Sequence, residues 1–245
     1  MPNRLDANAL NQLFLDARTQ NKWQAKDVPD SVLKELVHLT GMGPTSANCQ
    51  PGRILFVKSA AAKQRLAPFL SDSNRPKTME APVCAIIGFD LKFYEHLQKL
   101  FPHNLTARTW FEGKADHVHT TAIRNGSLQG AYFMLAVRAL GLDVGAMSGF
   151  DNAGVDKEFF PEGSVKTNFL CNIGYGDPAG VFARSPRVAV DEIAKILLAV
   201  SRNPAFARVR CSGPGPRATG TGGPTPDRHA APDPRARSSR QVRRS

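Results

Sequence analysis

Residues 120–140 have the sequence TTAIRNGSLQGAYFMLAVRAL and form the longest candidate helix of the chain. Gly141 follows at the position where a left-handed helix cap is common. A helix that is apolar around much of its surface packs on several sides, so we predict a central helix, with the rest of the fold built around it. The apolar residues at helical spacing are Ile123, Leu128, Ala131, Met134, Leu135 and Leu140.

Three shorter segments have the composition of strands. Residues 82–89, PVCAIIGF, are continuously apolar, as expected for a strand buried on both faces. Residues 53–58 and 166–173 are the other two candidates. Strands separated by helices predict a mixed α and β class, with one sheet covered by helices. Further helices are predicted over 6–18, from Asp30 or Ser31 to Leu39, over 60–70 and over 190–200.

The net charge of +11 over 245 residues is concentrated at one end of the chain. Residues 201–245 contain ten Arg, no Lys and two Asp, a balance of +8, with seven Pro and no Leu or Ile. Such a segment cannot bury enough apolar surface to offset its ordering entropy. We therefore predict a folded domain over 1–200 and a disordered Arg/Pro/Gly-rich tail over 201–245.

The arginines of the tail could hold nucleic acid or anionic lipid by counterion release. The tail lacks the interleaved aromatic residues on which bases stack, so a solvated appendage is the favoured interpretation. A shifted reading frame in GC-rich DNA would also produce a sequence of this kind.

The cysteines and the hydropathy restrict the class of protein. No stretch approaches the roughly 18 apolar residues of a membrane span, and residues 1–16 lack a secretory signal pattern. Cys49, Cys84, Cys171 and Cys211 have no CxxC spacing, which argues against a disulfide scaffold or a zinc ribbon. Thiols in a reducing compartment are the simpler interpretation. We predict a cytoplasmic protein without a membrane or nucleic-acid partner.

Residues 174–179, GYGDPA, match the GxGxx(G/A) dinucleotide pattern after a predicted strand. That mechanism requires a helix to begin there, with its N-terminus facing the pyrophosphate. Pro178 and Gly180 stand where the helix should begin, and Pro186 ends any helix soon after. The sequence favours a turn that leaves a strand.

The sequence gives little support for a metal site or for a catalytic nucleophile. His117 and His119 are two residues apart in a predicted loop-to-helix region, where such side chains diverge, so surface histidines are favoured over a zinc site. Ser148 lacks the glycine two residues earlier that a GxSxG elbow needs. Cys49 is a single cysteine with no placed histidine.

Two polar loops carry more information. Residues 18–23, RTQNKW, set a guanidinium, a hydroxyl and an ammonium group at the end of a predicted helix, a combination that suits a phosphate. Residues 44–51, PTSANCQP, are rich in turn formers and cannot form a regular element. Their neutral donors and acceptors suit a planar, hydrogen-bonding heterocycle.

In this order and spacing the two loops resemble the flavin-dependent nitroreductase family, in which an Arg-Arg-Ser-x-Arg-x-aromatic stretch precedes a Pro-Ser-x-x-Asn-x-Gln-Pro loop. Asn74 with Lys77 and Ala81-Pro82, the ALGLD of 139–143 and the GFD of 149–151 extend the resemblance over residues 8–198. The DART of 16–19, GPTSANC of 43–49 and SGFD of 148–151 are similar to the branch that contains the malonic semialdehyde reductase of pyrimidine degradation.

The resemblance implies an α+β, nitroreductase-like fold with a central, mostly antiparallel sheet covered by helices. It implies FMN as cofactor, NAD(P)H as co-substrate, no metal, and a homodimer whose flavin clefts are built from both chains. No catalytic side chain is expected, because hydride passes through flavin N5. The implied contacts are Arg18 and Thr19 with Arg184 or Arg187 at the phosphate; Pro44, Thr45, Ser46 and Asn48 along the flavin and ribityl chain; Asn74 at the ring edge; Asn125 at the pyrimidine side; and Ser148 and Gly149 near N5.

Three positions depart from the family pattern: Asn21 stands where many members have Arg or Lys, Ala146 where Pro is common, and Ser148 where several members have Glu. The first bears on phosphate affinity and the other two on nicotinamide docking. The implied reaction is reduction of malonic semialdehyde to 3-hydroxypropionate. A broad-specificity NAD(P)H nitroreductase or quinone reductase is the alternative, and a non-catalytic nucleic-acid-binding protein is a distant third.

Overall fold

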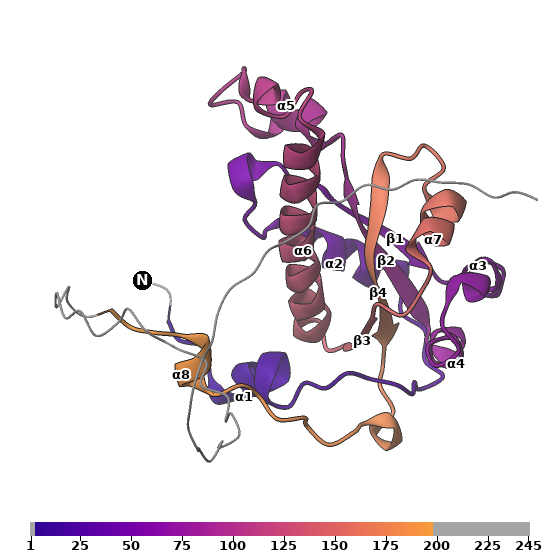
Figure 1. Cartoon of the computed structure of the whole chain (residues 1–245). Coiled ribbons are helices and arrows are strands. Elements are labelled where there is room, and N and C mark those ends of the chain that lie inside the picture. Colours follow the sequence, from indigo (N-terminus) through magenta and orange to yellow (C-terminus); the bar gives the residue numbers. More distant parts are fainter. Residues whose placement is uncertain (1–2, 198–245) are drawn as a thin grey trace, which may run out of the picture. The chain divides into compact units, whose positions relative to one another are not determined.

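The computed structural model describes residues 3–197, and residues 3–187 belong to one compact unit around a four-stranded sheet (Figure 1). The strands are β1 (Gly52–Val57), β2 (Val83–Asp90), β3 (Asp143–Met147) and β4 (Val165–Gly174). Their order is β1-β2-β4-β3, and every neighbouring pair is antiparallel. The antiparallel sheet of an α+β fold is thus confirmed.

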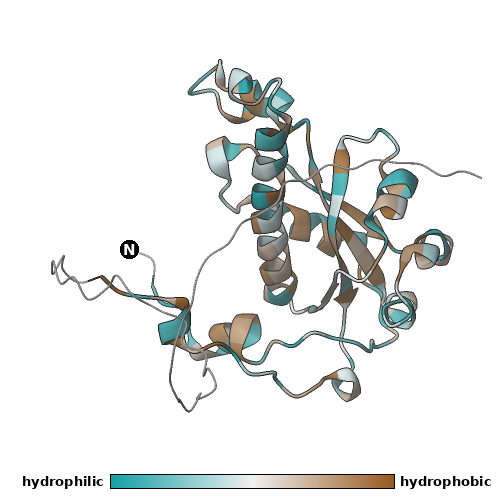
Figure 2. Cartoon of the chain, in the orientation of Figure 1, coloured by the Kyte–Doolittle hydropathy of each residue, from teal (hydrophilic) through white to brown (hydrophobic). Residues whose placement is uncertain are grey.

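The alternation of side chains along β2 places two separate cores on the two faces of the sheet. Val83, Ala85 and Ile87 pack with α2 (Asp30–Gly41) and α6 (Ala115–Ala139). Cys84 and Ile86 point to the other face, which is covered by α3 (Ala60–Leu66), α4 (Arg75–Glu80) and α7 (Asn152–Phe159). Every residue of β2 is buried, as its continuous apolar sequence predicts. In Figure 2 the strands are predominantly brown, whereas α3 and α7 also carry teal residues.

The predicted central helix is α6, which begins five residues before the predicted start. Its predicted packing on several sides is wrong for one chain, because none of the six apolar residues at helical spacing is buried, and Ile123 and Leu128 are exposed. Gly113, with φ of +75°, ends the preceding turn and lets the helix start at once. A Cβ at Gly126 would lie 2.8 Å from Phe89 Cβ, and one at Gly130 would lie 2.6 Å from the Phe169 ring. These two glycines therefore allow α6 to approach the sheet closely. Gly141, with φ of +75°, follows the helix as predicted.

A helical excursion joins β2 to α6. It contains 3-10 turns at Phe93–His96 and Ala107–Trp110 and the short helix α5 (Leu97–Leu100). Phe93, Leu97, Phe111 and Val118 hold it together as a third hydrophobic cluster. No periodic pattern in the sequence announces this segment, because its elements are too short to repeat.

Several predicted boundaries are wrong. The helix expected over 6–18 is α1 (Ala7–Leu10) followed by a π-helical turn, Asn11–Leu15. The helix expected over 60–70 stops at Leu66, because Pro68 stands in the next turn, a 3-10 turn over Ala67–Phe69. Strand β3 was not predicted, since Gly145 and Ala146 interrupt its apolar pattern.

Residues 188–197 belong to a second unit of the chain. They contain α8 (Val190–Ile193), so the helix expected over 190–200 is much shorter within the described part. The predicted domain boundary at 200 and the predicted tail over 201–245 lie outside the described residues. Within residues 3–197, no helix has the length and apolar character needed to cross a bilayer.

Candidate functional site

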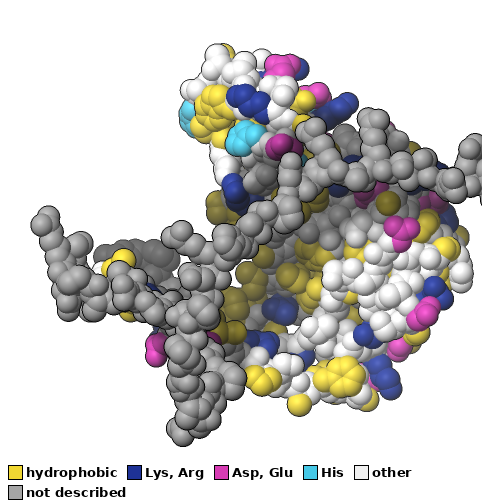
Figure 3. Space-filling view, viewed as in Figure 1, with side chains coloured by type: hydrophobic (Ala, Val, Ile, Leu, Met, Phe, Trp, Pro, Cys, Tyr) yellow, Lys and Arg dark blue, Asp and Glu magenta, His cyan; other side chains and the backbone are white. Residues whose placement is uncertain are grey.

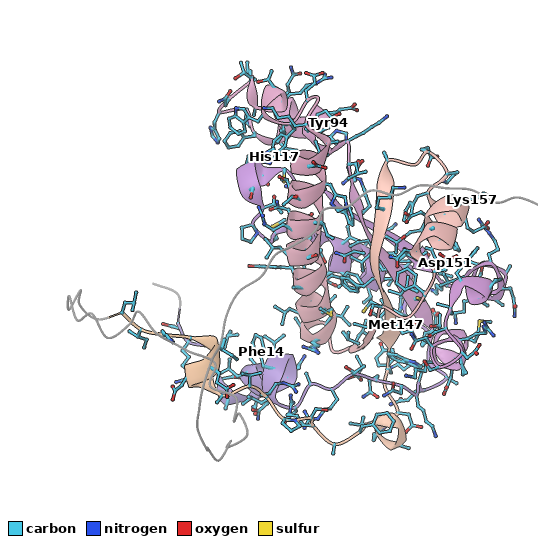
Figure 4. The ribbon with its side chains drawn as sticks, in the orientation of Figure 1. Phe14, Tyr94, His117, Met147, Asp151 and Lys157 are labelled. Atoms are coloured by element: carbon cyan, nitrogen blue, oxygen red, sulfur yellow. The ribbon has the colours of Figure 1, made fainter. Side chains whose placement is uncertain are left out.

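Four guanidinium groups gather around one pocket of about 490 Å³, which we call the arginine pocket. Arg18 comes from the segment after the first helical turns, Arg138 from the last turn of α6, and Arg184 and Arg187 from the segment that follows β4. Phe14, labelled in Figure 4, and Thr19 also line it. Figure 3 shows basic side chains beside hydrophobic ones near the C-terminal end of α6. The structure thus brings together four residues predicted for a phosphate: Arg18, Thr19, Arg184 and Arg187.

The carbonyl groups at the end of the first helical turns hold these cations in place. Arg18 Nη1 donates to the carbonyl oxygens of Leu15, Asp16 and Ala17 at 3.1, 3.2 and 3.0 Å. Arg184 Nη2 donates to the Ala17 oxygen at 3.0 Å and also to that of Leu15. Carbonyls at a helix end carry partial negative charge and favour cations. The π-helical turn therefore positions the guanidinium groups.

The positive charge of the arginine pocket is only partly offset by protein, because the charge of Asp16 opposes those of the arginines around Arg184. Within residues 3–197, none of the four guanidinium groups forms an ion pair with a carboxylate. Desolvation, and then the charges of Arg18 and Arg187, lower the pKa of Arg184. An anion would relieve this repulsion, and guanidinium forks match the oxygens of a phosphate. The donor set therefore fits a phosphate group.

The segment after Arg18 is docked on the edge of the sheet. Thr19 pairs with Val144 of β3 in a parallel bridge, and Gln20 N donates to the Val144 oxygen at 2.8 Å. Asn21 Nδ2 donates to the Gly180 oxygen at 3.2 Å. Asn21 thus ties the segment after Arg18 to the segment after β4.

A second group forms where β3 ends. Asn74 Nδ2 and Ser71 N both donate to the Gly149 oxygen at 3.1 Å. A Cβ at Gly149 would lie 2.7 Å from Asn74 Nδ2, so a larger residue would require the Asn74 side chain to move. Ser148 is exposed beside it. In Figure 4, Met147 and Asp151 mark the two sides of this loop. Asn74, Ser148 and Gly149 therefore form one edge at the end of β3, with Ser148 and Gly149 exposed and Asn74 half-buried.

The loop 44–51 forms a third group, anchored on α6 and α5. Ser46 N donates to Asn125 Oδ1 at 2.8 Å, and Asn125 Nδ2 donates to the Thr121 oxygen at 2.9 Å. Asn48 Nδ2 donates to the Leu100 oxygen at 2.8 Å. Asn125 is completely buried. The structure thus places Asn125 under the loop, with both ends of its amide in use.

The backbone of this loop is strained. Ala47, Asn48 and Gln50 have φ of 50°, 50° and 40°, in the left-handed region that side chains disfavour. Thr45 Oγ1 accepts a hydrogen bond from Gln50 N at 3.2 Å, which helps to fix this conformation. Pro44 and Ser46 are exposed at the start of the loop. Strained backbone of this kind concentrates at binding sites.

Cys49 is unsuited to nucleophilic catalysis. Its side chain is fully buried under the loop, and burial raises the pKa of the thiol to about 11. The thiolate is the reactive form and is scarce at neutral pH. Cys49 therefore serves the packing of the cluster that also contains Phe89 and Phe93.

The first and third groups contact different parts of α6, the first its C-terminal end and the third its middle. Asn125 contacts the loop 44–51, and Arg138 lines the arginine pocket. Thirteen residues of helix separate them, which is about 20 Å along the axis. Figure 4 shows Phe14 near one end of α6 and His117 at the other. Within one chain the loop 44–51 and the arginine pocket are thus well separated.

The structure shows the other candidate sites from the sequence, the GYGDPA stretch and the histidine pair, as a turn and as surface side chains. Residues 178–180 form a single 3-10 turn after β4, so the prediction of a turn at the GYGDPA stretch is confirmed. His117 and His119 are exposed on α6, one stacked on Phe111 and the other edge-on to Phe89. The part of the chain that the structure describes contains no group of three or more His, Cys, Asp or Glu suited to a metal ion.

Arg138 is the pocket residue that sequence reasoning missed. A cation in the last turn of a helix is usual, because it complements the negative end of the helix dipole. The position therefore gives no signal of a site. Only the tertiary contact with the first helical turns reveals that it faces Arg18 and Arg184.

Comparison with known proteins gives consistent results. The sequence profile of the Nitroreductase family matches residues 16–175. A protein of Burkholderia lata named "Putative NADH dehydrogenase/NAD(P)H nitroreductase" is 58% identical over 192 residues, which cover 78% of this chain and 98% of that protein. A protein of the same name from Stenotrophomonas maltophilia is 59% identical over 196 residues, covering 80% and 100%.

Solved structures share the fold at low sequence identity. A nitroreductase-type protein from Bacillus subtilis superposes with a TM-score of 0.71 at 19% identity, over 78% of this chain and all of that chain. A protein from Exiguobacterium sibiricum, solved in complex with FMN, gives a TM-score of 0.68 at 18% identity, over 80% and 100%. These similarities establish the architecture of residues outside the tail.

Proposed function

This chain belongs to the nitroreductase family, and we propose that it is an FMN-dependent NAD(P)H oxidoreductase. The observation that carries the proposal is the arginine pocket, four guanidinium groups without a carboxylate partner among the described residues. The similar fold of Exiguobacterium sibiricum was solved with FMN, and the related proteins carry NAD(P)H in their names.

Different residues of the site would bind different parts of the flavin cofactor. The arginine pocket with Thr19 would hold the phosphate, and the edge of Asn74, Ser148 and Gly149 would face the ring system. When bound, the flavin supplies the hydride chemistry, and the protein supplies position and electrostatics. No side chain needs to act as nucleophile or general acid, which agrees with the buried, raised-pKa Cys49.

We propose a homodimer in which the loop 44–51 of one chain completes the site of the other. Two observations support this arrangement. The loop lies about 20 Å along α6 from the arginine pocket of its own chain. In addition, α2, the residue that follows it and α6 expose large apolar side chains of the kind that interfaces cover. They are Val37 on α2, Met42 just after it, and Ile123, Leu128 and Tyr132 on α6.

The physiological acceptor we propose is malonic semialdehyde, reduced to 3-hydroxypropionate. The proposal rests on the SGFD and GPTSANC stretches, which resemble the semialdehyde-reductase branch. Reduction of nitroaromatics or quinones with broad specificity fits the names of the relatives equally. A cytoplasmic location is proposed with it, since Cys49, Cys84 and Cys171 are free and buried.

Steady-state kinetics test this choice. With NADH or NADPH as donor, kcat/KM is measured for malonic semialdehyde and for a nitroaromatic compound, because discrimination is expressed in that ratio. We expect parallel-line, ping-pong kinetics and a higher kcat/KM for the semialdehyde. A higher value for the nitroaromatic would support the broad-specificity alternative. If the flavin-loaded protein oxidised NAD(P)H with none of the acceptors, the proposal that it is an NAD(P)H oxidoreductase would be wrong.

A further inference from the structure

We propose that Arg138 is a phosphate-binding residue that makes this site select FMN over the uncharged riboflavin. The inference rests on the proposed function and deepens it, because it adds a specificity residue that the loop motifs do not contain. Arg138 lies in the last turn of α6, five residues before Asp143 begins β3. It lines the arginine pocket together with Arg18 and Arg184.

The hydrogen bonds of Arg138 leave most of its donors available. Its Nη1 donates to the Leu13 carbonyl oxygen at 3.1 Å, and no other acceptor within residues 3–197 bonds its guanidinium group. A guanidinium has five N–H donors in a rigid fork. One arm of Arg138 is therefore fixed on the first helical turns, and the remaining donors are available to a ligand in the pocket.

The surroundings of Arg138 favour an anion. In addition to desolvation, the charge of Arg138, like those of Arg18 and Arg187, lowers the pKa of Arg184, because each disfavours a further positive charge nearby. The negative end of α6 stabilises Arg138 itself and so permits this crowding. A phosphomonoester carries a charge of about −1.5 to −2 at pH 7, with a second pKa near 6. Such a group satisfies the guanidinium cluster, whereas the terminal hydroxyl of riboflavin does not.

A merely structural role for Arg138 is the competing explanation. Arg138 ties α6 to the first helical turns twice, because its own carbonyl oxygen accepts from Gln12 Nε2 at 2.6 Å. If anchoring were its whole contribution, substitution would loosen the pocket and weaken FMN and riboflavin alike. If charge is its contribution, only FMN is affected. The two explanations therefore differ in a measurable ratio.

The experiment compares Arg138→Ala, Arg138→Gln and Arg138→Lys with the parent protein, each as flavin-free full-length chain. Dissociation constants for FMN and for riboflavin are measured by fluorescence quenching at pH 7.5, and melting temperatures are measured without flavin. Glutamine keeps a donor for the Leu13 oxygen but no charge. Lys157→Ala is the control, because Lys157 is an exposed cation on α7, which covers the face of the sheet opposite α6, and does not line the pocket.

We expect the Ala and Gln variants to bind FMN about ten- to a hundredfold more weakly, with riboflavin affinity unchanged. Lysine should restore part of the loss, and Lys157→Ala should bind as the parent does. The parent's FMN affinity should fall from pH 7.5 to pH 5, and this fall should be smaller in Arg138→Gln. Equal weakening of FMN and riboflavin, or unchanged FMN binding, would overturn the role of Arg138 alone. A parent protein that binds neither flavin would overturn the proposed function together with it.

Discussion

At the scale of single residues, the geometry of the arginine pocket depends on the backbone carbonyl oxygens that accept hydrogen bonds from its guanidinium groups. Arg18 and Arg184 both donate to carbonyls of residues 15–17, and Arg138 donates to that of Leu13. The RTQNKW loop predicts Arg18 and Thr19, because a cation beside a hydroxyl suits phosphate. Arg138 was unpredictable, since its role arises from a tertiary contact 125 residues apart in sequence.

Replacement of Arg18 by alanine should weaken FMN binding about ten- to a hundredfold. The charge-assisted bonds it would donate to a phosphate are worth about 1.5–3 kcal/mol, and Asn21 carries no charge to replace them. The melting temperature without flavin should change little, because its acceptors belong to exposed or half-buried residues of its own turn. Flavin titration at fixed salt measures the effect. An unchanged dissociation constant would remove Arg18 from the site.

Cys49 should resist alkylation in the native protein. With its pKa raised to about 11, raising the pH from 7 toward 11 increases the thiolate fraction, and at pH 8 about one thiol in a thousand is ionised. Burial also blocks access. Iodoacetamide labelling at pH 8, followed by peptide mapping, should leave the Cys49 peptide unmodified until denaturant is added. Rapid labelling of that peptide in the folded protein would contradict the placement of Cys49.

At the scale of elements, the sequence predicted the helices and strands with strong hydrophobic patterns and missed or misplaced those with weak patterns. The continuous apolar run of β2 predicted a strand buried on both faces, and every residue of that strand is buried. The helix α6 was also predicted, but its packing was not: its buried face carries Val118, Phe133 and Val137. The apolar residues on which the prediction rested, such as Ile123 and Leu128, lie on its exposed side. Strand β3 was missed because its pairing with β4, and not its composition, makes it a strand. The first helix was predicted too long, since the apolar spacing from Leu10 to Ala17 continues through a π-helical turn.

Gly126→Ala should destabilise the protein by about 1–3 kcal/mol, the usual cost of overpacking. The added Cβ would lie 2.8 Å from Phe89 Cβ, an atom that no rotamer change can move away. Helix propensity alone would favour alanine by up to about 1 kcal/mol, so the sign of the effect is informative. Gly41→Ala in α2 is the matched control, because a Cβ there meets nothing within 4 Å. Denaturant unfolding should show a loss for Gly126→Ala only; equal stability of both variants would mean that α6 does not approach the sheet as described.

At the scale of the whole molecule, the loop 44–51 and the arginine pocket lie too far apart to contact the same part of one flavin within a single chain. This separation is the reason for proposing that a second copy of the chain supplies the loop. The two groups were predicted to share one flavin, and the antiparallel sheet and α6 hold them well apart in one chain. Sequence order cannot reveal this, because it does not say which chain supplies a residue. The homodimer therefore remains a prediction with a structural reason.

Leu128→Glu should convert the dimer to a monomer. Leu128 is about half exposed on α6, and a charge placed in an apolar interface is costly when unpaired. Gln64→Glu adds the same charge on exposed α3, which covers the opposite face of the sheet, and should leave the dimer intact. Sedimentation equilibrium measures the mass. A monomeric parent protein, or a dimer that persists in Leu128→Glu, would refute this interface.

The central claim is that the arginine pocket holds the phosphate of FMN, and the content of the purified protein tests it most directly. The purified full-length protein should be yellow, with a flavin absorption spectrum. Acid precipitation should release FMN into the supernatant in an amount stoichiometric with the chain, since the binding is non-covalent. A folded, colourless protein that does not take up FMN on reconstitution would contradict the account.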